Sequence, residues 1–128
     1  MKRKGNTYEG WESHAGGHYT RVYDDMLNSL PFTKLSHIAV RAYIILKKEY
    51  KGNFTGNEVI CPYSTFKGNG LTRNDTILKA IRELEAFGFI TVKSGGLHRE
   101  PNRYTFSDKW KSIKNLEEIE RIKASLKL

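Results

Sequence analysis

The stretch GLTRNDTILKAIRELEAFGFI, Gly70 to Ile90, decides the fold because its residues predict one helix together with both of its ends. Thr72, followed three residues later by Asp75, predicts a capping box with Asp in place of Glu, so we expect the helix to begin at Arg73. One helical arc is apolar and predicts the core face: Ile77, Ala80, Ile81, Leu84 and Phe87. The opposite face carries Asp75, Lys79, Arg82 and Ala86. Gly88 then stands where a left-handed residue commonly ends a helix.

Two further helices are expected before this stretch. SHIAVRAYIILKKEYKGN predicts a helix from Ser36 to Tyr50, with Ser36 as N-cap and lysines crowded into the last turn before Gly52. Between Gly52 and Gly70 the glycines, asparagines and proline interrupt every pattern, and only Tyr63 to Lys67 is predicted to be a short helix. Pro62 suits its first turn, and the Gly-Asn-Gly after Lys67 suits a helix stop and a tight turn.

A β-hairpin is expected after the helix. FITVKSGGLHREPNRYTF contains two β-rich runs separated by a loop with a Gly-Gly pair and a proline. Ile90 and Val92 on one run, and Tyr104 and Phe106 on the other, are spaced to share the buried face of an antiparallel pair.

The two ends of the chain differ in character. Residues 1–18 hold four of the eleven glycines and no periodic apolar pattern, which indicates a flexible arm. From Tyr19 a short extended piece and a turn of helix are expected, broken at Pro31. Residues 107–128 predict an amphipathic helix of roughly twenty residues, capped by Ser107 or Asp108 and anchored to the core by Trp110. This helix is expected either to pack on the Ser36–Tyr50 helix or to pair with its copy in a homodimer.

Composition and charge limit the function. The 128 residues favour one domain, and the 22 Lys and Arg against 14 Asp and Glu leave a formal charge of +8, which favours an anionic partner, either nucleic acid or a membrane surface. The single cysteine, Cys61, excludes an internal disulfide and a multi-cysteine zinc cluster within one chain and fits a reducing, cytoplasmic setting. No apolar run follows the basic N-terminus, so neither a secretory signal nor a membrane span is expected.

The order of helix, short helix, tight turn, amphipathic helix and hairpin resembles the winged helix-turn-helix family of DNA-binding domains over about Leu35 to Phe106. LTRNDTILKAIRELEAFGFI is similar to the recognition helix and first wing strand of bacterial members. Within it, IRELEAFGFI is similar to the pattern at the C-terminal end of such helices. The combination of YTRVYDDMLNSL, AVRAYIILKKEY and SGGLHREPNRYTFSDKW resembles small winged-helix proteins, and N-terminal domains of replication-initiation proteins, from phages, plasmids and conjugative elements. The implied fold is α+β, mainly α: an arm (1–18), a winged helix-turn-helix domain (19–106) and an added C-terminal helix (107–128).

The resemblance places the second helix of the motif in the major groove and a wing in the minor groove or on flanking phosphates. Arg73 is then suited to guanine and Asn74 to adenine, with the Thr72 and Thr76 hydroxyls on phosphates or bases. Arg99 is favoured for minor-groove insertion, and Lys2, Arg3 and Lys4 for added phosphate contacts. The DNA-binding set is Lys67, Thr72, Arg73, Asn74, Thr76, Lys79, Arg82, Lys93, His98, Arg99, Asn102 and Arg103.

No enzyme, cofactor or small-molecule substrate is expected, because the sequence has no phosphate-binding Gly-Lys-Ser/Thr loop, dinucleotide fingerprint, serine elbow or acidic cluster for magnesium. His14 and His18 have a metal-binding spacing only in a helix, which Gly16 and Gly17 disfavour. Cys61 is expected to be a small buried residue, and His37 a surface residue of a first helical turn.

The resulting hypothesis is sequence-specific binding of double-stranded DNA, by a transcriptional regulator or a replication or transfer accessory protein of a mobile element. One alternative is a protein-interaction module of a mobile element that uses the terminal helix or the aromatic N-terminal segment. Another is binding to RNA or single strands, which requires Tyr104 or Phe106 to be exposed.

Overall fold

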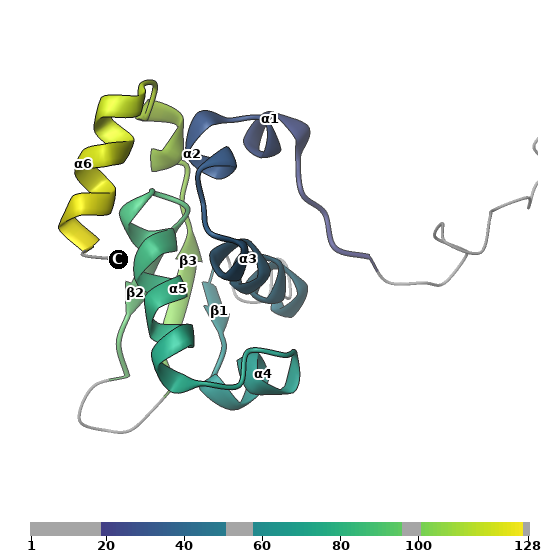
Figure 1. The fold of residues 1–128 in the computed structure, drawn as a ribbon. Coiled ribbons are helices and arrows are strands. Elements are labelled where there is room, and N and C mark those ends of the chain that lie inside the picture. The colour runs from purple at the N-terminus through teal and green to yellow at the C-terminus, as the bar shows by residue number, and fades with distance from the viewer. Residues whose placement is uncertain (1–18, 51–57, 96–100, 127–128) are drawn as a thin grey trace, which may run out of the picture.

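The computed structural model describes residues 19–50, 58–95 and 101–126, which form an α+β fold that is mainly helical (Figure 1). Its helices are α1 (Asp24–Leu27), α2 (Leu30–Thr33), α3 (His37–Glu49), α4 (Tyr63–Gly68), α5 (Asn74–Ala86), the 3-10 helix η3 (Lys109–Ser112) and α6 (Leu116–Leu126). Strands β1 (Glu58–Ile60), β2 (Ile90–Lys93) and β3 (Arg103–Phe106) form an antiparallel sheet in the order β1-β3-β2. None of the helices in these ranges has the length and apolar character that a membrane crossing requires.

Helix α3 matches the prediction to within one residue at each end. The Ser36 hydroxyl accepts the Ala39 N–H at 3.2 Å, which satisfies one of the amides that a helix start leaves without a partner. The buried face of α3 packs on α5 and consists of Ala39, Ala42, Tyr43, Ile45 and Leu46. His37 is exposed in the first turn, as expected.

The short helix and turn before α5 are also present. α4 extends through Gly68, one residue further than predicted, and Pro62 occupies the N-cap position instead of the first turn. The Leu71 N–H donates to the Phe66 carbonyl at 3.0 Å, and Gly70 has a φ of +102°, a conformation that glycine adopts at low cost.

The predicted start of α5 is wrong by one residue. Arg73 is the N-cap, with φ −110° and ψ 134°, and no side chain caps the helix, which begins at Asn74. Thr72 is therefore one position too early to act as a cap. The Asp75 carboxylate, predicted to complete the capping box, instead accepts two hydrogen bonds from the Arg73 guanidinium.

The end of α5 confirms the prediction. Gly88 has a φ of +83°, the Phe89 N–H donates to the Leu84 carbonyl and the Gly88 N–H donates to the Glu85 carbonyl, both at 3.0 Å. These two bonds form a Schellman motif, in which a left-handed residue satisfies the last carbonyls of a helix. The predicted core face is confirmed as well, because all five of its apolar residues are buried.

The predicted antiparallel pair is present, with Ile90 opposite Phe106 and Val92 opposite Tyr104. Strand β1 was not predicted, because it is only three residues long and only Val59 among them is buried. It pairs with β3, placing Val59 opposite Tyr104.

Phe89 lies at the centre of an aromatic core that joins the N- and C-terminal segments. Its ring lies 5.8 Å from Phe32 and 5.9 Å from Tyr43 in edge-to-face geometry, and it stacks on Trp110 at 6.0 Å. The expected core anchor at Trp110 is therefore confirmed.

Pro31 was expected to interrupt the helical turn that follows Tyr19, but it lies within a helix. It is buried in the first turn of α2, after the N-cap residue Ser29.

The predicted C-terminal helix of roughly twenty residues is wrong. Residues 109–112 form η3 instead, and α6 begins only at Leu116. Tertiary hydrogen bonds explain the break: the Ser107 N–H donates to the Phe89 carbonyl at 3.0 Å and the Trp110 N–H to the Gly88 carbonyl at 3.2 Å. The Asn115 side chain then accepts the Glu118 N–H at 2.9 Å and starts α6.

Helix α6 packs on α5, not on α3 as one of the two expectations had it, and Ile119 is buried in the shared core. Leu116 stays 54% exposed.

Candidate nucleic-acid interface

The N-terminal end of α5 carries four consecutive exposed residues, Thr72 to Asp75. The Arg73 guanidinium pairs side-on with the Asp75 carboxylate, with Nε–Oδ1 at 3.1 Å and Nη2–Oδ2 at 3.0 Å. Hydrogen bonds from Arg73 hold the pKa of Asp75 below its ordinary value of 3.8. The two side chains are 74% and 55% exposed, so solvent screens the pair and its opening costs little.

Further along α5 the exposed residues include Leu78, Lys79 and Arg82. Neither Lys79 nor Arg82 forms an ion pair with any residue of the described ranges. Thr76 lies differently from the other candidates on this helix: it is half-buried and, with Ser36, Ile38 and Lys79, lines a cavity of about 240 Å³ beside the start of α3.

Lys67 is exposed in the last turn of α4, as a phosphate-contacting residue needs to be. The neighbouring Asn69 accepts hydrogen bonds from two cations of α3, Arg41 and Lys48, which sequence reasoning did not assign to the site. The spacing of seven residues, two helical turns, places Arg41 and Lys48 on one face of α3, but only the fold brings that face to the turn after α4.

The candidates in the hairpin divide into two groups. Lys93 is exposed at the end of β2 and forms no ion pair within the described ranges. Asn102 and Arg103 are instead half-buried, and their side chains have hydrogen-bond partners within the sheet and the hairpin. The Asn102 side chain accepts the Gly95 N–H at 3.2 Å and donates to the Tyr104 hydroxyl at 3.3 Å, and Arg103 pairs with Glu58 at 3.0 Å. His98 and Arg99 lie outside the described residues, as do Lys2, Arg3, Lys4, His14 and His18.

Helix α4, the N-terminal end of α5 and the ends of β2 and β3 that carry Lys93 and Arg103 lie at the same end of the molecule (Figure 1). Within that end, α4 and the hairpin flank α5 on opposite sides. The structure thus brings Lys67, Arg73, Asn74 and Lys93 to one end, with Lys79 and Arg82 further along α5.

Three titratable side chains of the core, Cys61, Tyr43 and Tyr104, have pKa values that burial raises. Cys61 is fully buried, as expected, and burial raises the pKa of its thiol to about 12, so the thiol stays protonated at neutral pH. Burial likewise raises the pKa of Tyr43 and of Tyr104 to about 12. Tyr104 is fully buried, so its ring does not provide the stacking surface that the single-strand hypothesis required, while Phe106 is half-buried, with the Lys47 ammonium 4.7 Å from its ring centroid.

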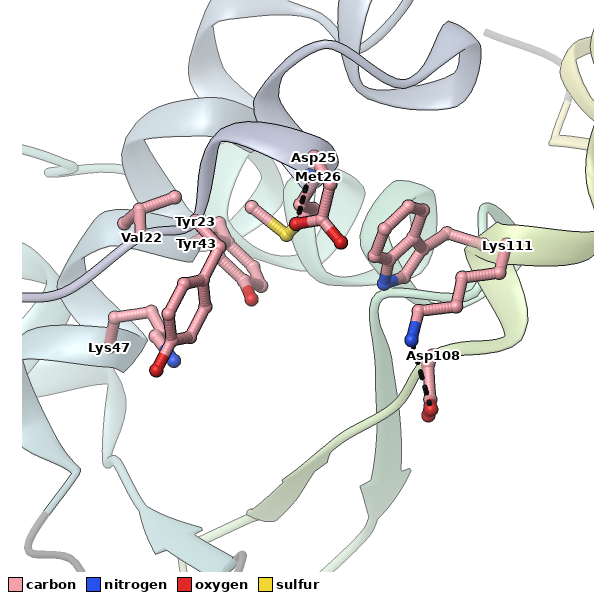
Figure 2. Close-up of a pocket in the computed structure, with 9 residues that line it drawn as sticks. Val22, Tyr23, Asp25, Met26, Tyr43, Lys47, Asp108 and Lys111 are labelled. Carbon is pink, nitrogen blue, oxygen red and sulfur yellow. Dashed lines mark hydrogen bonds and ion pairs between the residues drawn. The ribbon is translucent and has the colours of Figure 1, made fainter.

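A groove of about 460 Å³ lies between the N-terminal segment and η3, away from α4. Figure 2 shows Tyr43 and Lys47 on one side of it and Asp108 and Lys111 on the other. Its lining is aromatic and aliphatic with charges of both signs: Val22, Tyr23, Asp25, Met26, Tyr43, Lys47, Asp108, Trp110 and Lys111.

Comparison of this chain with family models, with curated proteins and with solved structures gives no match. The residues and their arrangement are therefore the basis of the functional proposal.

Proposed function

We propose that the chain is a winged helix-turn-helix domain that binds double-stranded DNA sequence-specifically, with α5 as the recognition helix and the β2–β3 hairpin as the wing. The observation that carries the proposal is that α5 presents two exposed cations, Lys79 and Arg82, that form no ion pair within the described ranges, while its N-terminal end lies at the same end of the molecule as the Lys93–Arg103 end of the hairpin. The order α3, β1, α4, α5, β2, β3 and the sheet order β1-β3-β2 support it.

The dimensions and chemistry of α5 suit the major groove. Its 13 residues span about 20 Å, and a groove about 12 Å wide admits one helix. At its exposed N-terminal end, Arg73 is suited to guanine and Asn74 to adenine, while Lys67, Lys79 and Arg82 are suited to phosphates. Such a protein acts as a transcriptional regulator or as a replication or transfer accessory protein of a mobile element.

Selection from a random duplex library at near-physiological salt tests the proposal. We expect an enriched motif, whose symmetry reports whether two copies bind together. Arg73→Ala combined with Asn74→Ala should abolish binding to that motif without unfolding the protein. The matched control, Arg121→Ala with Asn28→Ala, removes the same residue types from exposed sites on α6 and after α1. Unchanged affinity of the Arg73/Asn74 variant for the motif would refute the assignment.

The groove in Figure 2 favours a second candidate, a protein-interaction module of a mobile element. Tyr23 is 61% exposed at the edge of this groove, and Asp25 and Lys47 line it with opposite charges, an arrangement suited to a protein surface with aromatic and charged side chains. This candidate predicts that Tyr23→Ala abolishes partner binding while the Arg73/Asn74 double variant retains it. Recovery of a duplex motif that Tyr23→Ala still binds would favour DNA binding instead.

A further inference from the structure

Two cations of α3 converge on one residue of the turn that leads into α5. The Arg41 Nε donates to the Asn69 carbonyl at 3.3 Å, and the Lys48 ammonium donates to the Asn69 side-chain oxygen. Arg41 and Lys48 are two helical turns apart, about 10 Å along the axis, so their side chains must incline toward each other to reach the same residue. The two positive charges therefore contact the same residue, Asn69.

Asn69 and Gly70 hold this pair in place. The Asn69 amide donates to the Thr65 carbonyl of α4 at 2.8 Å, which orients its oxygen toward Lys48. A Cβ atom at Gly70 would lie 2.8 Å from Nη2 of Arg41, so the guanidinium packs directly against the turn. The positions of both cations thus depend on the same turn that sets the start of α5.

The charge of the pair is not neutralised within the described ranges. No carboxylate there lies within ion-pair distance of Arg41 or Lys48, and both residues are exposed. Asn69 supplies neutral acceptors that use one of the five guanidinium donors and one of the three ammonium donors. The remaining donors border a cavity of about 410 Å³, whose lining also includes His37, Val40 and Ile44.

We infer that Arg41 and Lys48 together bind a backbone phosphate of duplex DNA beside the groove that α5 enters, an inference that rests on the proposed function. A guanidinium binds two phosphate oxygens at once, and the adjacent ammonium adds a second charge to the same anion. Asn69 belongs to the turn after α4, which flanks α5 on the side opposite the hairpin (Figure 1). Phosphate contacts at the turn and at the hairpin would fix the orientation of α5 from both sides.

The test compares Arg41→Gln/Lys48→Gln with a matched control, Arg121→Gln/Lys114→Gln. Both variants remove one arginine and one lysine charge from exposed sites, and glutamine keeps a donor for Asn69. Affinity is measured against salt concentration on a duplex carrying the selected motif and on one of unrelated sequence. Loss of this one phosphate contact should flatten the slope of log K against log salt by about 0.9, equally on both duplexes, and the control should keep the wild-type slope.

Circular dichroism and a thermal melt confirm that each variant is folded. A wild-type slope in a folded Arg41/Lys48 variant would overturn the inference and leave the DNA-binding proposal standing, and so would an equal loss in the control, because only net charge would then matter. If the wild-type protein binds no duplex at all, the proposed function and this inference are both refuted.

Discussion

Glu83 of α5 binds both the backbone and the side chain of Ser36, the residue that caps α3. One carboxylate oxygen accepts the Ser36 N–H at 2.6 Å and the other accepts the Ser36 hydroxyl at 2.8 Å, while that hydroxyl accepts the Ala39 N–H. Glu83 is only 4% exposed. Its negative charge therefore lies at the positive end of the α3 dipole and fixes α3 relative to the proposed recognition helix.

Replacement of Glu83 by glutamine should destabilise the fold by about 1.5–3 kcal/mol, the usual value of hydrogen bonds to a charged group. Glutamine keeps one acceptor oxygen but replaces the other with an amide donor. The Ser36 N–H and hydroxyl both donate to Glu83, so one of them would lose its acceptor. Urea unfolding of Glu83→Gln and of the exposed control Glu120→Gln measures the effect. Equal stability of the two variants would show that the buried carboxylate contributes nothing beyond its shape.

Gly88→Ala should destabilise the protein more strongly than an ordinary surface change. A Cβ there would lie 2.7 Å from the Trp110 backbone nitrogen and 2.9 Å from the Lys109 carbonyl carbon, and the φ of +83° is itself unfavourable for alanine. Gly68→Ala is the control, because Gly68 is helical and a Cβ there meets nothing within 4 Å. That change should stabilise by about 0.5–1 kcal/mol. Thermal melts that shift in the same direction for both variants would contradict this account.

The Arg73–Asp75 pair should be visible in the titration of Asp75. Because the folded-state pKa is lowered, the pairing is complete above the ordinary value of 3.8 and is lost as the pH falls through the lower folded-state pKa. Carbon-detected NMR should give Asp75 a pKa below 3.8 in the wild type and a higher pKa in Arg73→Ala, which lacks the largest cause of the lowering. Arg82→Ala, a control on the same helix, should leave the Asp75 titration unchanged. An Asp75 titration that does not respond to Arg73→Ala would mean that the pair does not form in solution.

Local signals account for what the sequence predicted well. The apolar arc of α5 and the left-handed Gly88 depend on neighbouring residues, and so does the strand alternation at Ile90 and Val92 that predicted the hairpin. Strand β1 escaped prediction because its three residues are stabilised by β3, more than forty positions away. Glu83 was missed for the same reason, since its partner Ser36 is 47 positions away. No local pattern marks an acid that is buried by a distant helix cap.

The same distinction applies to the candidate site. Sequence reasoning placed Lys67, Lys79, Arg82 and Lys93 on the surface, where the structure has them. It assigned Asn102 and Arg103 to DNA without foreseeing that Tyr104 and Glu58 are their hydrogen-bond partners. Periodicity predicts which face of a helix or strand is exposed, but not which polar side chains are occupied by tertiary contacts.

Asp75→Asn should strengthen DNA binding if Arg73 contacts DNA as proposed. The change removes a negative charge beside the phosphates and releases the Arg73 guanidinium, so one added charge becomes available to the duplex. We expect a higher affinity for the duplex and a steeper slope of log K against log salt, because the net positive charge that faces the phosphates increases. Asp75 also stabilises the N-terminal end of α5 through the helix dipole, so the variant should be less stable by about 0.3–1 kcal/mol even though it binds more tightly.

Asp108→Asn is the matched control for this prediction. It makes the same change of net charge and also disrupts an exposed ion pair, with Lys111, but in a segment that packs at the C-terminal end of α5, opposite Arg73. Salt titrations of both variants on the selected duplex separate a local effect from a general one. Equal gains in affinity would mean that only the net charge of the protein matters and would remove Arg73 from the interface. A gain confined to Asp75→Asn would place the first turn of α5 on the DNA, because only there does the lost carboxylate release an arginine that faces the duplex.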